Sequence, residues 1–322
     1  MSSINTTIDN STKFAFLFPG QGSQVVGMGK ELYDNSPAAK LVFDEIDDAL
    51  NQPLSKLIFE GPESELTLTR NTQPGIMAVS LAAYKAMEEL LGKKDMPQPS
   101  FVAGHSLGEY TALAITESLD ISSTAKLVQE RGRLMQEACN LQPGTMAAII
   151  GLDEVIIEEI SRQTGTYISN INTDHQVVIS GDIVAVAQAL DMASARGAKR
   201  AMPLKVSGAF HSALMEPARD GLESAVNAVN LQVPSTPIVA NITAKPINTV
   251  NLLKKELVSQ ICECVQWKMS IEYMISLGIT SFIEIGPGTA LTGFIRRIDR
   301  EIEVLNVADS ESLEKTVTAL SA

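Results

Sequence analysis

Short apolar runs alternate with longer amphipathic segments along most of the chain. The run Phe14–Phe18 is apolar throughout, which is typical of a strand in a parallel sheet that is buried on both faces. By the same criteria, strands are expected at residues 14–18, 101–103, 237–240 and 279–285, and helices at residues 37–50, 71–91, 109–117, 122–138, 213–230, 252–262 and 290–298. This alternation predicts an α/β fold with a mostly parallel sheet that is covered by helices on both faces.

A different order follows Pro143-Gly144. Strands are expected at residues 146–150, 167–170, 177–180 and 200–206, with helices at 154–163 and 183–196. This β-α-β-β-α-β order is the ferredoxin-like pattern. A chain of 322 residues also exceeds what one compact core usually needs. We therefore expect a large α/β-hydrolase-like subdomain at residues 13–139 and 206–322, an inserted ferredoxin-like subdomain at 140–205, and a flexible tail at 1–12.

Composition narrows the class of protein. The net charge of −13 argues against nucleic-acid binding, which requires a basic face. No apolar run reaches the ~18 residues that a membrane span needs, and the polar N-terminus does not have the pattern of a secretory signal. The cysteines are Cys139, Cys262 and Cys264, an odd number that suggests a reducing, cytoplasmic setting. No spacing of histidine and cysteine matches a zinc site, so no metal is expected.

The segment Gly104-His105-Ser106-Leu107-Gly108 fits the pattern G-x-S-x-G between an expected strand and an expected helix. Glycines on each side of the serine remove the Cβ atoms that would clash in a sharp turn. Such a turn exposes the serine Oγ at the top of a sheet, beside the free N–H groups of a helix start. Ser106 is therefore the candidate nucleophile, the alternative being a glycine-rich turn with an incidental serine.

A serine nucleophile needs a base, and the chain has three histidines. His105 adjoins Ser106, but neighbours on a tight turn point apart. His175 lies in an expected hairpin turn and is predicted to be solvated. His211 follows a strand and precedes a helix, where catalytic groups of α/β folds gather, so it is the candidate base.

No acid that would orient the histidine stands out. The aspartates between serine and histidine that come into question are Asp120, Asp174 and Asp182, and each suits a helix cap or a turn better. Arg131 lies on the expected helix 122–138. Taken alone, a helical arginine is most simply a solvated surface charge.

Six segments of the chain together point to a family. They are Phe18-Pro19-Gly20-Gln21-Gly22-Ser23-Gln24, Gly104-His105-Ser106-Leu107-Gly108-Glu109-Tyr110, Gln129-Glu130-Arg131-Gly132, Ala209-Phe210-His211-Ser212, Val265-Gln266-Trp267 and Glu284-Ile285-Gly286-Pro287-Gly288. In this order, over about residues 13–308, they closely resemble the malonyl-CoA:acyl carrier protein transacylases, the stand-alone acyltransferases of type II fatty acid synthesis. They are also similar to polyketide acyltransferase domains.

The resemblance implies a role for each matching residue. Ser106 would attack the malonyl thioester, and His211 would act as its base. A backbone carbonyl near Gln260 would hold the imidazole in place of an acid. The backbone N–H groups of Gln21 and Leu107 would form the oxyanion hole, where donors face developing negative charge.

Two further matches concern the substrate. Arg131 would hold the free carboxylate of malonyl with two parallel hydrogen bonds, which lysine could not reproduce. Phe210 before the histidine resembles malonyl-selective sites and would crowd out an α-methyl group, although core packing explains it equally well. One position departs from the family, since Cys264 stands where a proline commonly precedes Val-Gln-Trp, which predicts a less firmly fixed backbone near Gln260.

The implied reaction is a ping-pong transfer of malonyl from coenzyme A to the phosphopantetheine thiol of an acyl carrier protein, with no cofactor, by a monomer. Docking of an acidic carrier protein would need a local basic patch, and the candidates are Arg200, Lys205, Arg296, Arg297 and Arg300. The alternatives are a trans-acting acyltransferase of a polyketide pathway, an acyl-thioester hydrolase on the same scaffold, and a non-catalytic carrier-protein docking module.

Overall fold

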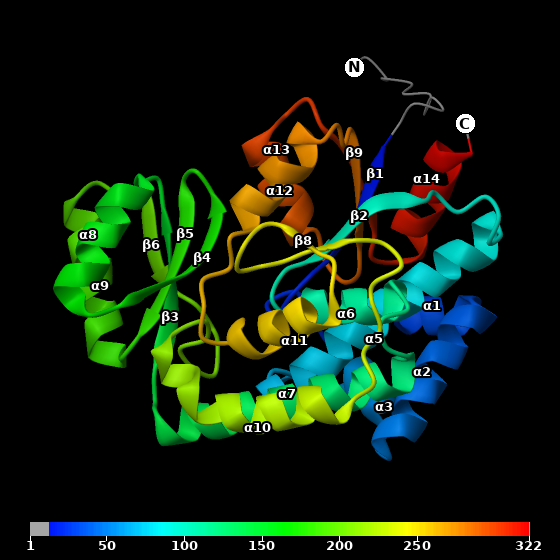
Figure 1. Ribbon diagram of the computed structural model, residues 1–322, viewed down its shortest axis with the longest axis horizontal. Helices are drawn as coiled ribbons and strands as arrows, with labels where there is room; N and C mark the ends of the chain where they lie inside the picture. Colours follow the sequence, from blue (N-terminus) through cyan, green and yellow to red (C-terminus); the bar gives the residue numbers. More distant parts are fainter. Residues whose placement is uncertain (1–12, 322) are drawn as a thin grey trace.

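The computed structural model describes residues 13–321, so the tail expected at residues 1–12 lies outside the described part. Within that part the strands form one sheet of six strands and one of four. Figure 1 shows the four-stranded sheet and its two helices, α8 and α9, standing to one side of the larger body. The chain passes from the larger body into this smaller unit and back again.

The larger sheet has the order β10-β9-β1-β2-β7-β8. Its strands are β1 (Phe14–Phe18), β2 (Pro99–Gly104), β7 (Ile238–Val239), β8 (Pro246–Ile247), β9 (Ser281–Ile285) and β10 (Glu303–Val307). The first five strands in this order are parallel, and β8 alone pairs antiparallel, with β7. The expected α/β fold with a mostly parallel, hydrolase-like sheet is confirmed.

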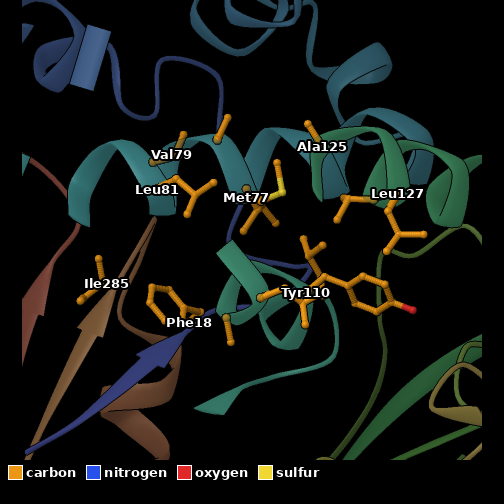
Figure 2. Close-up of a cluster of buried hydrophobic side chains, with 14 of the residues drawn as sticks. Phe18, Met77, Val79, Leu81, Tyr110, Ala125, Leu127 and Ile285 are labelled. Carbon is orange, nitrogen blue, oxygen red and sulfur yellow. The ribbon is translucent and has the colours of Figure 1, made fainter. Parts of the chain in front are cut away.

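Helices cover both faces of this sheet. They are α1 (Lys30–Asn35), α2 (Pro37–Leu50), α3 (Leu54–Glu60), α4 (Glu63–Leu66), α5 (Thr69–Leu91), α6 (Leu107–Ile115), α7 (Ile121–Leu141), α10 (Glu216–Ala228), α11 (Val250–Ser259), α12 (Trp267–Ser276), α13 (Ala290–Ile298) and α14 (Ser310–Leu320). Alternation along β1 sends Phe16 and Phe18 into the core with α2, α5 and α7, and Ala15 and Leu17 into a second core with α12 and α13. Figure 2 shows Leu81 of α5 pointing toward Phe18 and Ile285 of the sheet.

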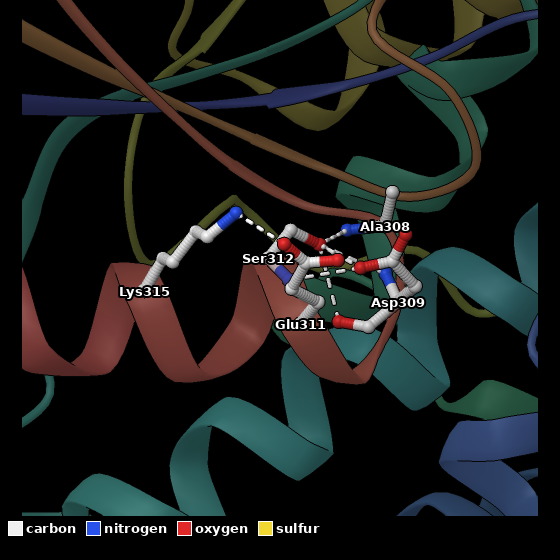
Figure 3. A network of polar contacts seen from close by, with 5 residues as sticks. All are labelled: Ala308, Asp309, Glu311, Ser312 and Lys315. Atoms are coloured by element: carbon white, nitrogen blue, oxygen red, sulfur yellow. Dashed lines mark hydrogen bonds and ion pairs between the residues drawn. The ribbon is translucent and has the colours of Figure 1, made fainter.

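The structure adds several elements that the sequence pattern did not predict. These are α1, α3, α4, α12, α14, β8 and β10. Most are short, and the conformation of short helices depends on packing against the rest of the fold more than on their own sequence. A clear local signal was present for α14, whose first turn is closed by a capping box between Asp309 and Ser312, shown in Figure 3.

The smaller unit consists of β3 (Thr145–Ile150), α8 (Glu154–Thr164), β4 (Tyr167–Thr173), β5 (Gln176–Gly181), α9 (Ile183–Ala195) and β6 (Arg200–Pro203). Its strands are antiparallel in the order β4-β5-β3-β6, with the two helices packed on one core. This is the ferredoxin-like arrangement that the order of elements predicted.

Backbone hydrogen bonds fix the smaller unit to the segment that carries Cys264. The N–H of Val265 donates to Ser169 O (2.9 Å), and the N–H of Ile171 donates to Val265 O (3.0 Å). Cys264 itself packs against the core of the smaller unit. The segment is thus held by pairing with β4, although the proline common in the family is missing.

Candidate active site

The structure places Ser106 in a strained turn between β2 and α6. Its φ is 52° and its ψ is −104°, a region that non-glycine residues rarely occupy. The turn is tight on both sides: a Cβ on Gly104 would lie 1.8 Å from the carbonyl carbon of Gly108, and a Cβ on Gly108 would lie 2.0 Å from Phe18 O. Only glycine fits at these two positions, as the G-x-S-x-G pattern predicted.

The histidine chosen from the sequence lies directly beside this serine. Ser106 Oγ and His211 Nε2 are 2.8 Å apart. On the other side of the ring, His211 Nδ1 lies 2.7 Å from Gln260 O and 3.2 Å from Glu263 O. Because carbonyl oxygens only accept hydrogen bonds, Nδ1 carries the proton, and Nε2 is left to accept one from the serine hydroxyl.

The environment of His211 favours its neutral form. Burial, and after it the positive charge of Arg131, lower the pKa of His211 to about 3, while the hydrogen bonds to Gln260 O and Glu263 O act in the opposite direction. The imidazole is 4% exposed. At neutral pH it is therefore unprotonated, as a general base must be.

Arg131 is a buried cation rather than the surface charge that its sequence context suggested. It is 1% exposed and lies over the ring of Tyr110, with 5.0 Å between the guanidinium carbon and the ring centroid. Its Nη1 donates to Gln73 Oε1 (2.6 Å), and its Nη2 donates to Gln260 Oε1 (2.8 Å) and Ser106 Oγ (3.3 Å). Among residues 13–321 it makes no salt bridge, which leaves a positive charge beside the serine unpaired.

The loop after β1 packs against the turn that holds Ser106. A Cβ on Gly20 would lie 2.4 Å from His105 O, so the neighbouring Gln21 is brought close to the turn. Leu107 is the first residue of α6, where backbone N–H groups have no partner within the helix. No acceptor in the described part of the chain binds the backbone N–H of Gln21 or of Leu107.

The other histidines and the aspartates lie away from the Ser106–His211 pair or serve other purposes. His105 Nε2 is 2.9 Å from Asn172 Oδ1, and its ring packs against Trp267. His175 is exposed in the turn between β4 and β5, as expected. The aspartates behave as caps and turn residues: Asp120 caps α7, Asp182 caps α9, and Asp174 pairs with Lys268.

Three side chains of the site were missed from the sequence: Gln73, Glu109 and Asn241. Asn241 Oδ1 accepts from the backbone N–H of Ser106 (2.7 Å), and its Nδ2 donates to Gly104 O (2.7 Å). Its position just after β7, at the carboxyl ends of the parallel strands where binding sites form, was a usable signal. Phe210, by contrast, is buried within the main core, beside His211 in sequence.

Taken together, a strained serine at a strand-to-helix turn, a neutral histidine and an unpaired buried cation define a serine-dependent enzyme of acyl chemistry on an α/β-hydrolase-like fold.

Comparison with known proteins places the chain more narrowly. The chain belongs to the acyl transferase domain family, whose family model matches residues 15–316. It is 40% identical over 314 residues to the malonyl CoA-acyl carrier protein transacylase of Bacillus subtilis, covering 96% of this chain and 98% of the relative. The resemblance to this group of acyltransferases, first seen in six motifs, is confirmed.

Solved structures agree with this assignment. The acyl-carrier-protein-S-malonyltransferase of Bartonella henselae superposes with a TM-score of 0.92 at 44% identity, covering 97% of this chain and all of that one. A malonyl-transacylase in complex with its type II PKS acyl-carrier protein gives a TM-score of 0.90 at 38% identity, covering 96% of this chain and 99% of that one. The enzyme is thus an acyltransferase. No helix among its described residues is long and apolar enough to cross a bilayer.

Proposed function

We propose that this acyltransferase moves a malonyl group from malonyl-CoA to the phosphopantetheine thiol of an acyl carrier protein through a malonyl ester of Ser106. One observation carries the choice of malonyl over a neutral acyl group: the buried guanidinium of Arg131, 3.3 Å from Ser106 Oγ, has only neutral amide and hydroxyl partners. A carboxylate on the acyl group would give the guanidinium a direct, negatively charged partner. The names and folds of the relatives support the same assignment.

In the first half-reaction, His211 Nε2 takes the proton of Ser106 Oγ as the oxygen attacks the thioester carbonyl. The tetrahedral oxyanion is bound by the backbone N–H groups of Gln21 and Leu107, which have no other acceptor among residues 13–321. The carbonyls of Gln260 and Glu263 stabilise the imidazolium through Nδ1. Collapse of the intermediate breaks the C–S bond, His211 returns the proton to the departing thiolate, and malonyl-serine remains.

The second half-reaction runs in the opposite direction with a new thiol. His211 removes the proton of the phosphopantetheine thiol, the thiolate attacks the serine ester, and Ser106 Oγ leaves with that proton. Arg131 holds the malonyl carboxylate throughout, so the ester carbonyl keeps its place in the oxyanion hole. Selectivity against an α-methyl group is assigned to Phe210, which is buried next to the base.

Several further properties remain predictions. The proposed chemistry uses no metal or cofactor, and we expect a monomer in the cytoplasm; the three free cysteines are in keeping with a reducing compartment. An acyl carrier protein is the partner, as in the related complex. Of the basic residues expected to bind it, Arg297 on α13 already donates to Gln176 of the smaller unit (2.7 Å). Charge reversal of all five should slow transfer to the carrier protein but not formation of malonyl-serine.

The pathway that receives the product is proposed to be fatty acid synthesis. A polyketide pathway is the alternative, favoured by the related complex with a type II PKS carrier protein. The alternative of an acyl-thioester hydrolase is less favoured, because such an enzyme would not need a buried cation to bind a carboxylate on the acyl group.

Intact-mass measurement after brief mixing with malonyl-CoA tests the proposal. We expect a malonyl adduct in the wild-type protein, none in Ser106→Ala, and little in Arg131→Ala, which should react better with acetyl-CoA than the wild type does. Steady release of malonate without an adduct would replace transfer with hydrolysis. Equal malonyl loading of wild type and Arg131→Ala would refute the role of the guanidinium.

A further inference from the structure

The residue directly after the G-x-S-x-G segment is a buried carboxylate to which the mechanism assigns nothing. Glu109 is 0% exposed on the first turn of α6. Its Oε1 accepts from Asn241 N (2.8 Å) and Asn241 Nδ2 (3.0 Å), and its Oε2 accepts from Gln260 Nε2 (2.6 Å). Both partners also contact Ser106. An isolated carboxylate is costly to bury, so its retention here requires these partners.

The orientation of the Gln260 amide follows from chemistry alone. Arg131 can only donate, so the atom that faces Nη2 at 2.8 Å is the amide oxygen. Ser106 O can only accept, so the atom that faces it at 2.9 Å is the amide nitrogen. The remaining N–H of the same nitrogen donates to Glu109 Oε2. The amide thus lies between a cation and a carboxylate, with each end matched to its neighbour.

The charge on Glu109 is set by opposing effects. Burial, followed by the nearby Glu256, raises the pKa of Glu109 well above its ordinary value, and the hydrogen bonds from Asn241 and Gln260 and the charge of Arg131 act in the opposite direction. All three hydrogen bonds are donated to the Glu109 oxygens, and none in the described structure is donated by them. The hydrogen-bond pattern therefore fits the ionised carboxylate.

We propose that Glu109 is a positioning residue that orients the Gln260 amide toward Arg131 and balances the arginine charge from one amide away, so that Arg131 stays free to bind a substrate carboxylate. A direct Glu109–Arg131 ion pair would occupy the guanidinium that malonyl must bind. The intervening amide keeps the negative charge in the network but leaves no carboxylate on Arg131. This inference rests on the proposed malonyl transfer.

Substitution of Glu109 by glutamine tests the orientation. The amide that E109Q introduces keeps its oxygen toward Asn241, so its NH₂ group faces Gln260 Nε2 as donor against donor. The Gln260 amide then turns over and presents its own NH₂ group to Arg131. We expect kcat/KM for malonyl-CoA to fall roughly ten- to a hundredfold, the range of one charge-assisted hydrogen bond, mainly through KM, while acetyl-CoA changes much less.

Glu284 provides a matched control. It is also fully buried and accepts three hydrogen bonds, from Leu291 N, Thr292 N and Thr292 Oγ1, but it caps α13 and does not contact the site residues. E284Q should lower stability without changing the preference for malonyl-CoA over acetyl-CoA. If kcat/KM in E109Q falls equally for malonyl-CoA and acetyl-CoA, or changes for neither, the proposed role of Glu109 is overturned.

If E109Q does not fold, a second variant tests the premise that a carboxylate bound directly to Arg131 would compete with malonyl. Q73E places a carboxylate directly on Arg131 Nη1, where Gln73 Oε1 now accepts at 2.6 Å. The preference for malonyl-CoA should then fall at least tenfold, because the substrate competes with a built-in partner; an unchanged preference would overturn the inference. Absence of any malonyl-serine in the wild type would overturn the proposed function as well, whereas a normal adduct with an unaltered preference in both variants overturns only this inference.

Discussion

The low pKa of His211 predicts that Ser106 stays reactive in acid where ordinary serine–histidine pairs lose activity. Burial and the charge of Arg131 lower this pKa from 6.5 to about 3. At pH 5 a histidine with the ordinary pKa is roughly 3% neutral, whereas one with a pKa of about 3 is roughly 99% neutral. The base is thus available across the whole range from pH 7 to pH 5.

The assay is the rate of Ser106 modification by phenylmethylsulfonyl fluoride, a neutral reagent that needs no carboxylate contact. Between pH 7 and pH 5 the rate constant should change by less than about twofold, whereas an unshifted base would slow it about 25-fold. Arg131→Met removes the second cause of the shift, so its rate should begin to fall at a higher pH than that of the wild type.

One neighbouring group titrates in the same range and must be controlled. Burial raises the pKa of Glu256 to about 7, and its carboxylate accepts from the backbone N–H of Ile242 beside Asn241. Glu256→Gln removes this titration and should leave the flat profile unchanged. A fall in rate centred near pH 6.5, in both the wild type and Glu256→Gln, would refute the argument that burial keeps His211 neutral.

Local geometry and charge lead to three further predictions. The pKa of His211 is lowered on folding, so between pH 6.5 and pH 3 the histidine binds a proton in the unfolded chain but not in the folded one. The free energy of unfolding, measured with urea, should therefore fall over this range by up to ~1.4 kcal/mol per pH unit more in the wild type than in His211→Gln. Gly108→Ala should destabilise the fold severely, since its Cβ would lie 2.0 Å from Phe18 O. Gly293→Ala on α13, with open space around it, should instead stabilise the fold by about 1 kcal/mol, and unfolding of both variants by urea checks the contrast. Phe210→Leu should raise kcat/KM for methylmalonyl-CoA relative to malonyl-CoA roughly tenfold, which lies within the ~1–3 kcal/mol by which a pocket discriminates one methyl group. An unchanged ratio would mean that Phe210 only packs in the core.

Local patterns in the sequence were sufficient for the turn and for the base. Gly104 and Gly108 are required by contacts within a few residues of Ser106 and by the end of β1, and the strand and helix on either side have clear apolar patterns. His211 could be chosen because His105 adjoins Ser106 on a tight turn and His175 lies in a hairpin turn, whereas His211 lies between a strand and a helix. The assignments of the turn and of the base both depend on residues that are close in sequence, and a sequence pattern contains that information.

The network behind the site could not be predicted in this way. Glu109 meets Asn241 and Gln260 across more than a hundred residues, and these pairs exist only because β2, β7 and α11 come together in the fold. A glutamate in the first turn of a helix is ordinarily explained by the helix dipole and solvent. Arg131 was open to the same ordinary explanation, and only the family resemblance indicated otherwise.

This distant network also explains how Ser106 can keep its strained backbone. A residue at φ 52° persists only where its surroundings over-determine it. Here both backbone polar groups of Ser106 are bound by side chains from the other half of the chain: Asn241 accepts from its N–H, and Gln260 donates to its carbonyl. Since both side chains also donate to Glu109, and Gln260 contacts His211 and Arg131 as well, the interactions that hold the nucleophile in its turn are the ones that place its base and its cation.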